Sequence, residues 1–204
     1  MTSLSINRQN RSIAVLLHYE WFLPIFLAYL GKDYKVDFLE EKTGIKEGKA
    51  LFTIELAKTA ALLGYGIHFY SKRLLFDESY MDLDFYKQHG VMDVEQSKRL
   101  LQESRSAGVR AEERTLTLEE LLTQVTQNSI PIVILDWNVV LGKKELGYRG
   151  HFVPIVGYDD AYVYIHQHGL NQPQAFMPIE KRLFDEARKA RGTDEDIIII
   201  SLKN

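Results

Sequence analysis

The chain has 204 residues, of which 46% are hydrophobic and 26% are charged, and its formal net charge is −3 at pH 7. This size and balance are typical of one globular domain, so we expect residues 1–204 to form a single domain. Without a basic excess, nucleic acid and anionic membranes are not expected as partners. No apolar run reaches the roughly 20 residues of a membrane helix. The N-terminal segment lacks the features of a signal peptide, which predicts a cytoplasmic protein.

Helical periodicity or capping signals mark five segments. They are residues 14–31, 48–66, 93–108, 117–125 and 179–190. The first is apolar nearly all round, which predicts a buried and at least partly helical element. Asp93 and the Thr117–Glu120 pair are N-cap signals. Gly64 and Gly108 are expected to end the second and third helices.

Strand patterns are more frequent in the second half of the chain. We expect strands at residues 65–71, 109–115, 129–140 and 195–202, and an antiparallel hairpin made by 151–158 and 161–168. Helices come first and antiparallel strands dominate later. This order predicts an α+β fold with N-terminal helices packed on a C-terminal antiparallel sheet. Residues 73–90 are rich in aromatic and acidic residues without a period, which favours a surface insertion that covers another part of the molecule.

Three of the six histidines lie in the stretch "GHFVPIVGYDDAYVYIHQHG", residues 150–169. His166 and His168 are two residues apart on a strand and therefore share a face. A hairpin that turns at residues 159–161 places His151 beside His168, with Cβ atoms roughly 5 Å apart. Imidazoles at that distance can share a proton, a water or a metal ion. The alternative is that each histidine is a strand residue satisfied by a backbone partner.

Four stretches together carry a resemblance to a known family. They are "YLG" (29–31), "LFTIELAKTAALLG" (51–64), "GHFVPIVGYD" (150–159) and "FDEARKARGTDEDIIIISL" (184–202). This pattern resembles papain-like cysteine peptidases of the bacteriocin-processing (double-glycine) type. It is more closely similar to the family of guanylyl cyclase domain-containing protein 1, and it extends over most of the chain. The resemblance implies a papain-like fold.

The resemblance also implies positions for a catalytic triad. The general base of the family falls on His151, the residue that orients it falls on His168, and the nucleophilic cysteine falls on His18, within "LHY". The chain contains no cysteine. It therefore cannot form the thiolate that a papain-like peptidase requires. Cyclase activity has little support, because we find neither a phosphate-binding glycine loop nor a clear pair of metal-binding aspartates.

Two chemical interpretations remain for the histidine-rich cleft. In the first, His18, His151, His166 and His168 bind a divalent metal such as Zn, Fe, Ni or Cu, which polarises a carbonyl or activates water. In the second, His151 is a general base in metal-free chemistry with an external nucleophile such as a substrate amine. Both predict a thiol-free, papain-like hydrolase or acyltransferase that acts on an amide or acyl group. The alternative is a catalytically dead pseudopeptidase that binds a peptide or protein partner.

Residues near the cleft are candidates for contact with a small-molecule or peptide substrate. Asp136, Trp137 and Asn138 follow a buried strand, and Tyr19 neighbours His18. The alternative for residues 136–138 is that they only turn the chain. The oligomeric state is left open by the sequence.

Overall fold

The computed structural model of the protein describes residues 38, 41–42, 52–89, 93–167 and 173–203. Its elements in chain order are α3 (Thr53–Leu62), β1 (Gly66–Ser71), η2 (Glu78–Asp82), α4 (Asp84–His89), α5 (Val94–Ser106), β2 (Val109–Glu113), α6 (Leu118–Leu122), β3 (Ser129–Asp136), α7 (Trp137–Val140), η3 (Lys144–Leu146), β4 (Gly150–Tyr158), β5 (Tyr162–Gln167), β6 (Gln174–Glu180), α8 (Lys181–Arg188) and β7 (Ile197–Ser201). The element predicted at 14–31 lies outside the described residues. None of the helices in the described part combines the length and apolar character that crossing a membrane requires.

Local signals set the N-terminal ends of α5 and α6 as predicted. The Asp93 carboxylate accepts from the Gln96 N–H at 2.6 Å, and the Gln96 side chain accepts in turn from the Asp93 N–H. Thr117 and Glu120 make the same reciprocal pair at the start of α6. These capping boxes satisfy N–H groups that have no partner inside the helix.

The seven described strands join one sheet in the order β2–β1–β7–β3–β4–β5–β6. β1 and β2 are parallel, and the other neighbouring pairs are antiparallel. The α+β class is therefore confirmed. The predicted separation into N-terminal helices and a C-terminal antiparallel sheet is wrong, because the sheet is mixed and includes β1 from the first half of the chain. Parallel strands need a crossover connection, and α5 supplies it between β1 and β2.

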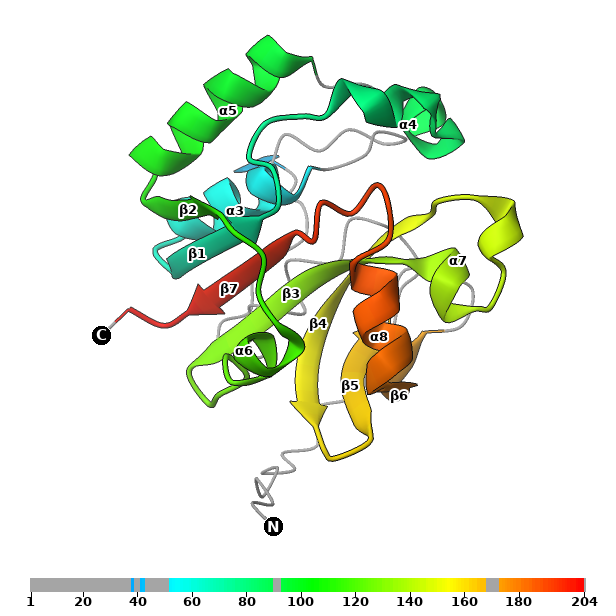
Figure 1. The fold of residues 1–204 in the computed structure, drawn as a ribbon. Helices are drawn as coiled ribbons and strands as arrows, with labels where there is room; N and C mark the ends of the chain where they lie inside the picture. The colour runs from blue at the N-terminus through cyan, green and yellow to red at the C-terminus, as the bar shows by residue number, and fades with distance from the viewer. Residues whose placement is uncertain (1–37, 39–40, 43–51, 90–92, 168–172, 204) are drawn as a thin grey trace.

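Helices cover both faces of this sheet (Figure 1). On one face, which we call the α3/α5 face, both helices pack in one cluster with Ile198 and Ile200. On the other, the α6/α8 face, the helices pack with Ile197 and Ile199. β7 is therefore buried on both sides, and this explains why its residues are apolar without alternation.

The segment predicted as a surface insertion contains η2 and α4 and forms a cap at one end of the sheet. Figure 1 shows it beside the loop that joins α8 to β7. The Tyr80 hydroxyl donates to Asp194 Oδ1 and the Tyr86 hydroxyl donates to the Gly192 carbonyl, both at 2.7 Å. The Tyr86 ring stacks on Tyr80 and on Tyr148, with centroids 5.9 and 5.8 Å apart. The insertion thus covers the loop before β7.

A buried arginine anchors the same loop from the other side. The Arg188 side chain is 1% exposed and pairs with Asp185 at 2.5 Å and with Glu195 at 3.5 Å. It also donates to the Leu116 carbonyl at 3.0 Å. The Thr193 hydroxyl donates back to the Arg188 carbonyl at 2.7 Å. Because a buried charge is tolerated only when it is paired, this network ties the loop to α8.

Asp196 lies at the end of this loop, directly before β7. Burial raises the pKa of the Asp196 carboxyl from 3.8 to about 7, against the Ser71 and Thr53 hydroxyls, which lower it. The folded protein therefore keeps a proton on Asp196 that the unfolded chain would release above about pH 4. The stability linked to this proton is fully present below that pH and is lost as the pH rises to about 7.

We expect Asp196→Asn to stabilise the protein increasingly as the pH rises from 5 to 8, because asparagine has no charge to bury. One pKa unit corresponds to about 1.4 kcal/mol, so the gain at pH 8 should be of the order of 2–4 kcal/mol. Urea unfolding of both proteins at several pH values measures this gain. Asp160→Asn, at an exposed turn residue, is the matched control and should show no such trend. An unchanged pH dependence in Asp196→Asn would contradict the buried-acid interpretation.

Candidate active site

The strand predicted over residues 129–140 ends earlier than expected, at Asp136. The carboxylate Oδ1 of Asp136 accepts from the N–H groups of Asn138 at 3.0 Å and Arg149 at 3.1 Å. The first of these bonds caps α7, which replaces the last four residues of the predicted strand. An aspartate that caps a helix favours a turn over a continued strand, and this is the physical reason for the correction.

His151 is the second residue of β4 and lies opposite Leu135 of β3. Its side chain is buried, the whole residue being 3% exposed, and its ring meets that of Trp137 at an angle of 71° with centroids 4.8 Å apart. The backbone N–H of Trp137 donates to the Arg149 carbonyl at 2.7 Å, which holds the residue in place. The structure thus gathers Asp136, Trp137 and His151 where β3 ends and β4 begins, and we call this group the β3–β4 corner.

Asn138, the third predicted substrate-binding residue of this segment, is engaged within the protein. Its Nδ2 donates to the Gly147 carbonyl at 2.7 Å, and its backbone carbonyl accepts from the Lys143 N–H at 2.7 Å. These bonds fold the loop between α7 and β4 and so help to place His151. A contact of Asn138 with substrate stays a prediction.

Tyr148 belongs to this region, although the sequence analysis did not single it out. Its hydroxyl lies so close to Gly150 that a Cβ atom there would be 2.6 Å away. Burial raises the Tyr148 pKa well above its usual value, and the charges of Asp196 and Asp136 act in the same direction. Tyr148 is therefore within electrostatic range of both Asp136 and Asp196. The sequence signal was the glycine before His151, which leaves the space that the tyrosine fills.

His166 lies on the opposite face of the sheet from His151. Its strand neighbour Ile165 packs on the α6/α8 face, as does Leu135, the residue paired with His151. Side chains alternate along β5, so the His166 imidazole projects from the α3/α5 face. Its Nδ1 accepts from the Phe176 N–H at 3.1 Å, and burial lowers its pKa, which favours the neutral, accepting ring.

The metal site predicted from four histidines is therefore not assembled as expected. His151 and His166 leave the sheet on opposite faces and cannot bind one ion together. Within the described ranges, no group of three or more His, Cys, Asp or Glu side chains could hold a metal ion. The remaining predicted residues, His18, Tyr19 and His168, lie outside the described residues. A triad or metal centre formed by His18, His151 and His168 stays a prediction.

The β3–β4 corner contains groups that acid–base chemistry uses. An imidazole changes its protonation near neutral pH. Burial raises the pKa of Asp136, against three backbone hydrogen bonds that lower it. Ionisable groups with shifted pKa values that are gathered away from water are enriched in functional sites. The corner is therefore the candidate active site.

Comparison with known proteins supports one part of the resemblance found in the sequence, the similarity to the guanylyl cyclase domain-containing protein 1 family. A family model described as "Guanylylate cyclase" matches residues 25–200. The curated protein Guanylyl cyclase 1 of Arabidopsis thaliana is 23% identical over 179 residues, which cover 81% of this chain and 65% of that relative. The match thus spans less than two thirds of the relative's own length. Because the family model covers well over half of the sequence, the chain belongs to the guanylylate cyclase family.

Proposed function

We propose that the protein is a thiol-free enzyme of the papain-like class that hydrolyses or transfers an amide or acyl group of a small or peptidic substrate. The observation that carries this proposal is the contact of His151 with Trp137 at the shared end of β3 and β4. The resemblance to papain-like peptidases implies that His151 takes the position of their general base. Two of the residues expected to line the substrate cleft lie beside it.

The chain contains no cysteine, so the nucleophile in this proposal comes from outside the protein, as water or a substrate amine. His151 would accept the proton of that nucleophile while its oxygen or nitrogen bonds to the carbonyl carbon. The proton would then pass to the leaving group as the bond between that group and the carbonyl carbon breaks. Trp137 would offer the substrate an apolar surface and limit the access of bulk water.

Replacing His151 by glutamine tests the proposed base. General acid–base catalysis contributes about 100-fold to 10,000-fold, so we expect kcat/KM to fall by about 100-fold or more. Turnover is measured by mass spectrometry on a panel of peptides, N-acyl amino acids and amine acceptors. His166→Gln is the matched control, because it changes a histidine of the same sheet on the opposite face and should alter turnover by less than about threefold.

Three results would contradict this function. His151→Gln could retain the wild-type rate. The wild type could bind peptides from the panel without converting any of them, which is the behaviour of a pseudopeptidase. The protein could instead show guanylyl cyclase activity that His151→Gln leaves intact, and the activity in the relative's name would then apply to this chain as well.

The remaining metal hypothesis has a separate test. If His18, His151 and His168 bind a divalent ion, Zn, Fe, Ni or Cu should raise Tm, because a ligand at about 100 times its Kd stabilises the folded state by roughly 2.7 kcal/mol. His151→Ala should remove this shift and His166→Gln should keep it. The measurement uses protein purified without an affinity tag. An unchanged Tm with all four metals, or equal loss of the shift in both variants, would contradict the hypothesis.

A further inference from the structure

A second group of ionisable side chains lies on β1 and β2, outside the β3–β4 corner. The Tyr70 hydroxyl is 2.9 Å from His68 Nδ1, and His68 Nε2 is 2.8 Å from Glu112 Oε1. The rings of His68 and Tyr70 are also in contact, with centroids 4.1 Å apart. The three side chains therefore form a continuous hydrogen-bonded chain, which we call the Tyr–His–Glu relay.

The strand register explains why these residues meet. Tyr70 lies opposite Glu112 in the parallel pairing of β1 with β2, and His68 lies two residues before Tyr70 on the same face. The residues on either side of His68, Ile67 and Phe69, are buried on the α3/α5 face. The relay is consequently on the other face. The side chains of His68 and Glu112 are 25% and 34% exposed, so solvent molecules can reach them.

The proton positions in the relay follow from its chemistry. Partial burial and the nearby Glu112 charge raise the Tyr70 pKa above its usual value. The Tyr70 hydroxyl is therefore protonated at neutral pH and is the donor to His68. The hydrogen bond from His68 lowers the Glu112 pKa, so this carboxyl is an acceptor. His68 therefore accepts at Nδ1 and donates from Nε2–H. A hydroxyl, a base beside it and an acid that orients the base are the parts of an activated nucleophile.

Two arginines complete the surroundings of the relay. Arg110 Nε lies 3.3 Å from Glu112 Oε1 and helps to position that carboxylate. The Arg114 guanidinium lies over the Tyr70 ring, 5.9 Å from its centroid, and also pairs with Glu120. A cation in this position stabilises negative charge that develops on the phenol oxygen as its proton leaves.

We propose that Tyr70 is a nucleophile that accepts an acyl group from an activated acyl donor, with His68 as its base and Glu112 as the residue that positions His68. Tyr70 Oη would attack the acyl carbon while its proton passes to His68 Nδ1. The bond between the acyl carbon and the leaving group then breaks, and the leaving group takes the proton from His68. The products are O-acyl-Tyr70 and the protonated leaving group. This activity involves neither His151 nor the β3–β4 corner.

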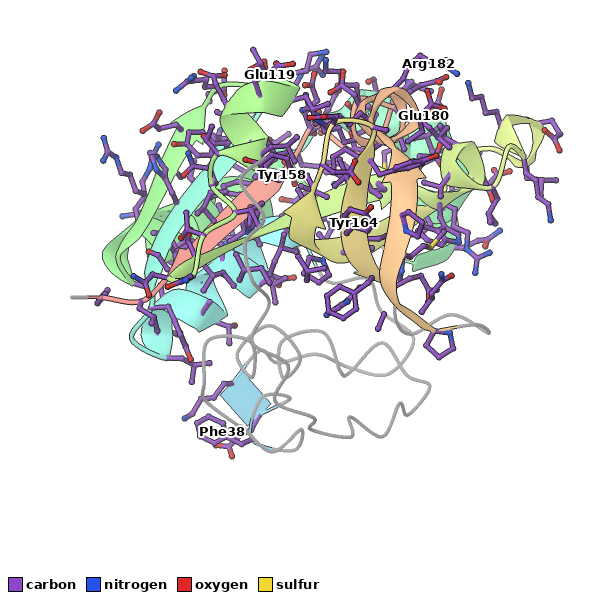
Figure 2. All side chains as sticks on the ribbon, turned by 90° about the horizontal axis from the view of Figure 1, so that it is seen from below. Phe38, Glu119, Tyr158, Tyr164, Glu180 and Arg182 are labelled. Atoms are coloured by element: carbon purple, nitrogen blue, oxygen red, sulfur yellow. The ribbon has the colours of Figure 1, made fainter. Side chains whose placement is uncertain are left out.

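Acetylation by N-acetylimidazole, with imidazole as the leaving group, tests the proposal on the full-length protein. Tyr158 and Tyr162 are internal references, because they are 44% and 43% exposed whereas Tyr70 is half-buried. Tyr158 lies on the β4–β5 half of the sheet, away from β1 and β2 (Figure 2). Exposure alone predicts slower labelling of Tyr70. We expect Tyr70 to be acetylated at least about tenfold faster than either reference, measured by peptide mass spectrometry.

Two variants separate the relay from simple reactivity of the phenol. His68→Phe keeps a ring beside Tyr70 but removes the base, so the Tyr70 rate should fall to the reference rates or below them, while the rates of Tyr158 and Tyr162 are unchanged. Glu112→Gln should lower the Tyr70 rate less strongly. The reference tyrosines and the circular dichroism spectrum report whether each variant stays folded. Labelling of wild-type Tyr70 no faster than the references, or an unchanged Tyr70 rate in a folded His68→Phe protein, would overturn the proposal.

Discussion

The architecture depends on the burial of β7 on both of its faces. Its four consecutive isoleucines, Ile197–Ile200, are at most 6% exposed. Burying each such side chain contributes about 1.5–3 kcal/mol, and this is available only if both faces of the strand are covered. β7 therefore lies between β1 and β3, with α3 and α5 on one face and α6 and α8 on the other. The loop before β7 consequently lies at the end of the sheet that the segment with η2 and α4 covers.

Side chains alternate between the two faces of the sheet along every strand, and this decides which polar side chains meet. His151 projects to the α6/α8 face and meets Trp137, whereas His166 projects to the other face and satisfies the backbone N–H of Phe176. His68 and Tyr70, two residues apart, share one face. Strand alternation thus separates His151 from His166, which the sequence had suggested as partners. It also brings together His68 and Tyr70, which the sequence had not suggested as a pair.

Buried ionisable groups are concentrated at one end of the sheet. The pKa values of Asp136, Tyr148 and Asp196 are all raised, and desolvation by burial is the largest cause in each case. Burying such groups opposes folding unless their hydrogen bonds are satisfied. The aromatic cap and the paired Arg188 hold the surrounding loops in place against this cost. Ionisable groups with raised pKa values are thus gathered beside the β3–β4 corner, as they often are in functional sites.

The sequence by itself determined the elements whose signals lie within a few residues of one another. The Asp93 and Thr117 capping boxes, the glycines that end α3 and α5 and the β4–β5 hairpin belong to this group, because their contacts are local. The role of His151 as a general base rests on the resemblance of its motif to a family pattern and stays a prediction. β6 was missed, since its mostly exposed residues do not show the alternation of a half-buried strand.

Only the tertiary structure decided which distant segments meet. The parallel pairing of β1 with β2, the bond from the Arg149 N–H to Asp136 at the end of β3 and the stacking of Tyr86 on Tyr148 all join residues that are not close in the chain. The contact of His151 with Trp137 and its separation from His166 depend on register and on which face of the sheet is covered. Local patterns give the period of a strand but not its partner, because the partner is chosen by the burial of the whole sheet.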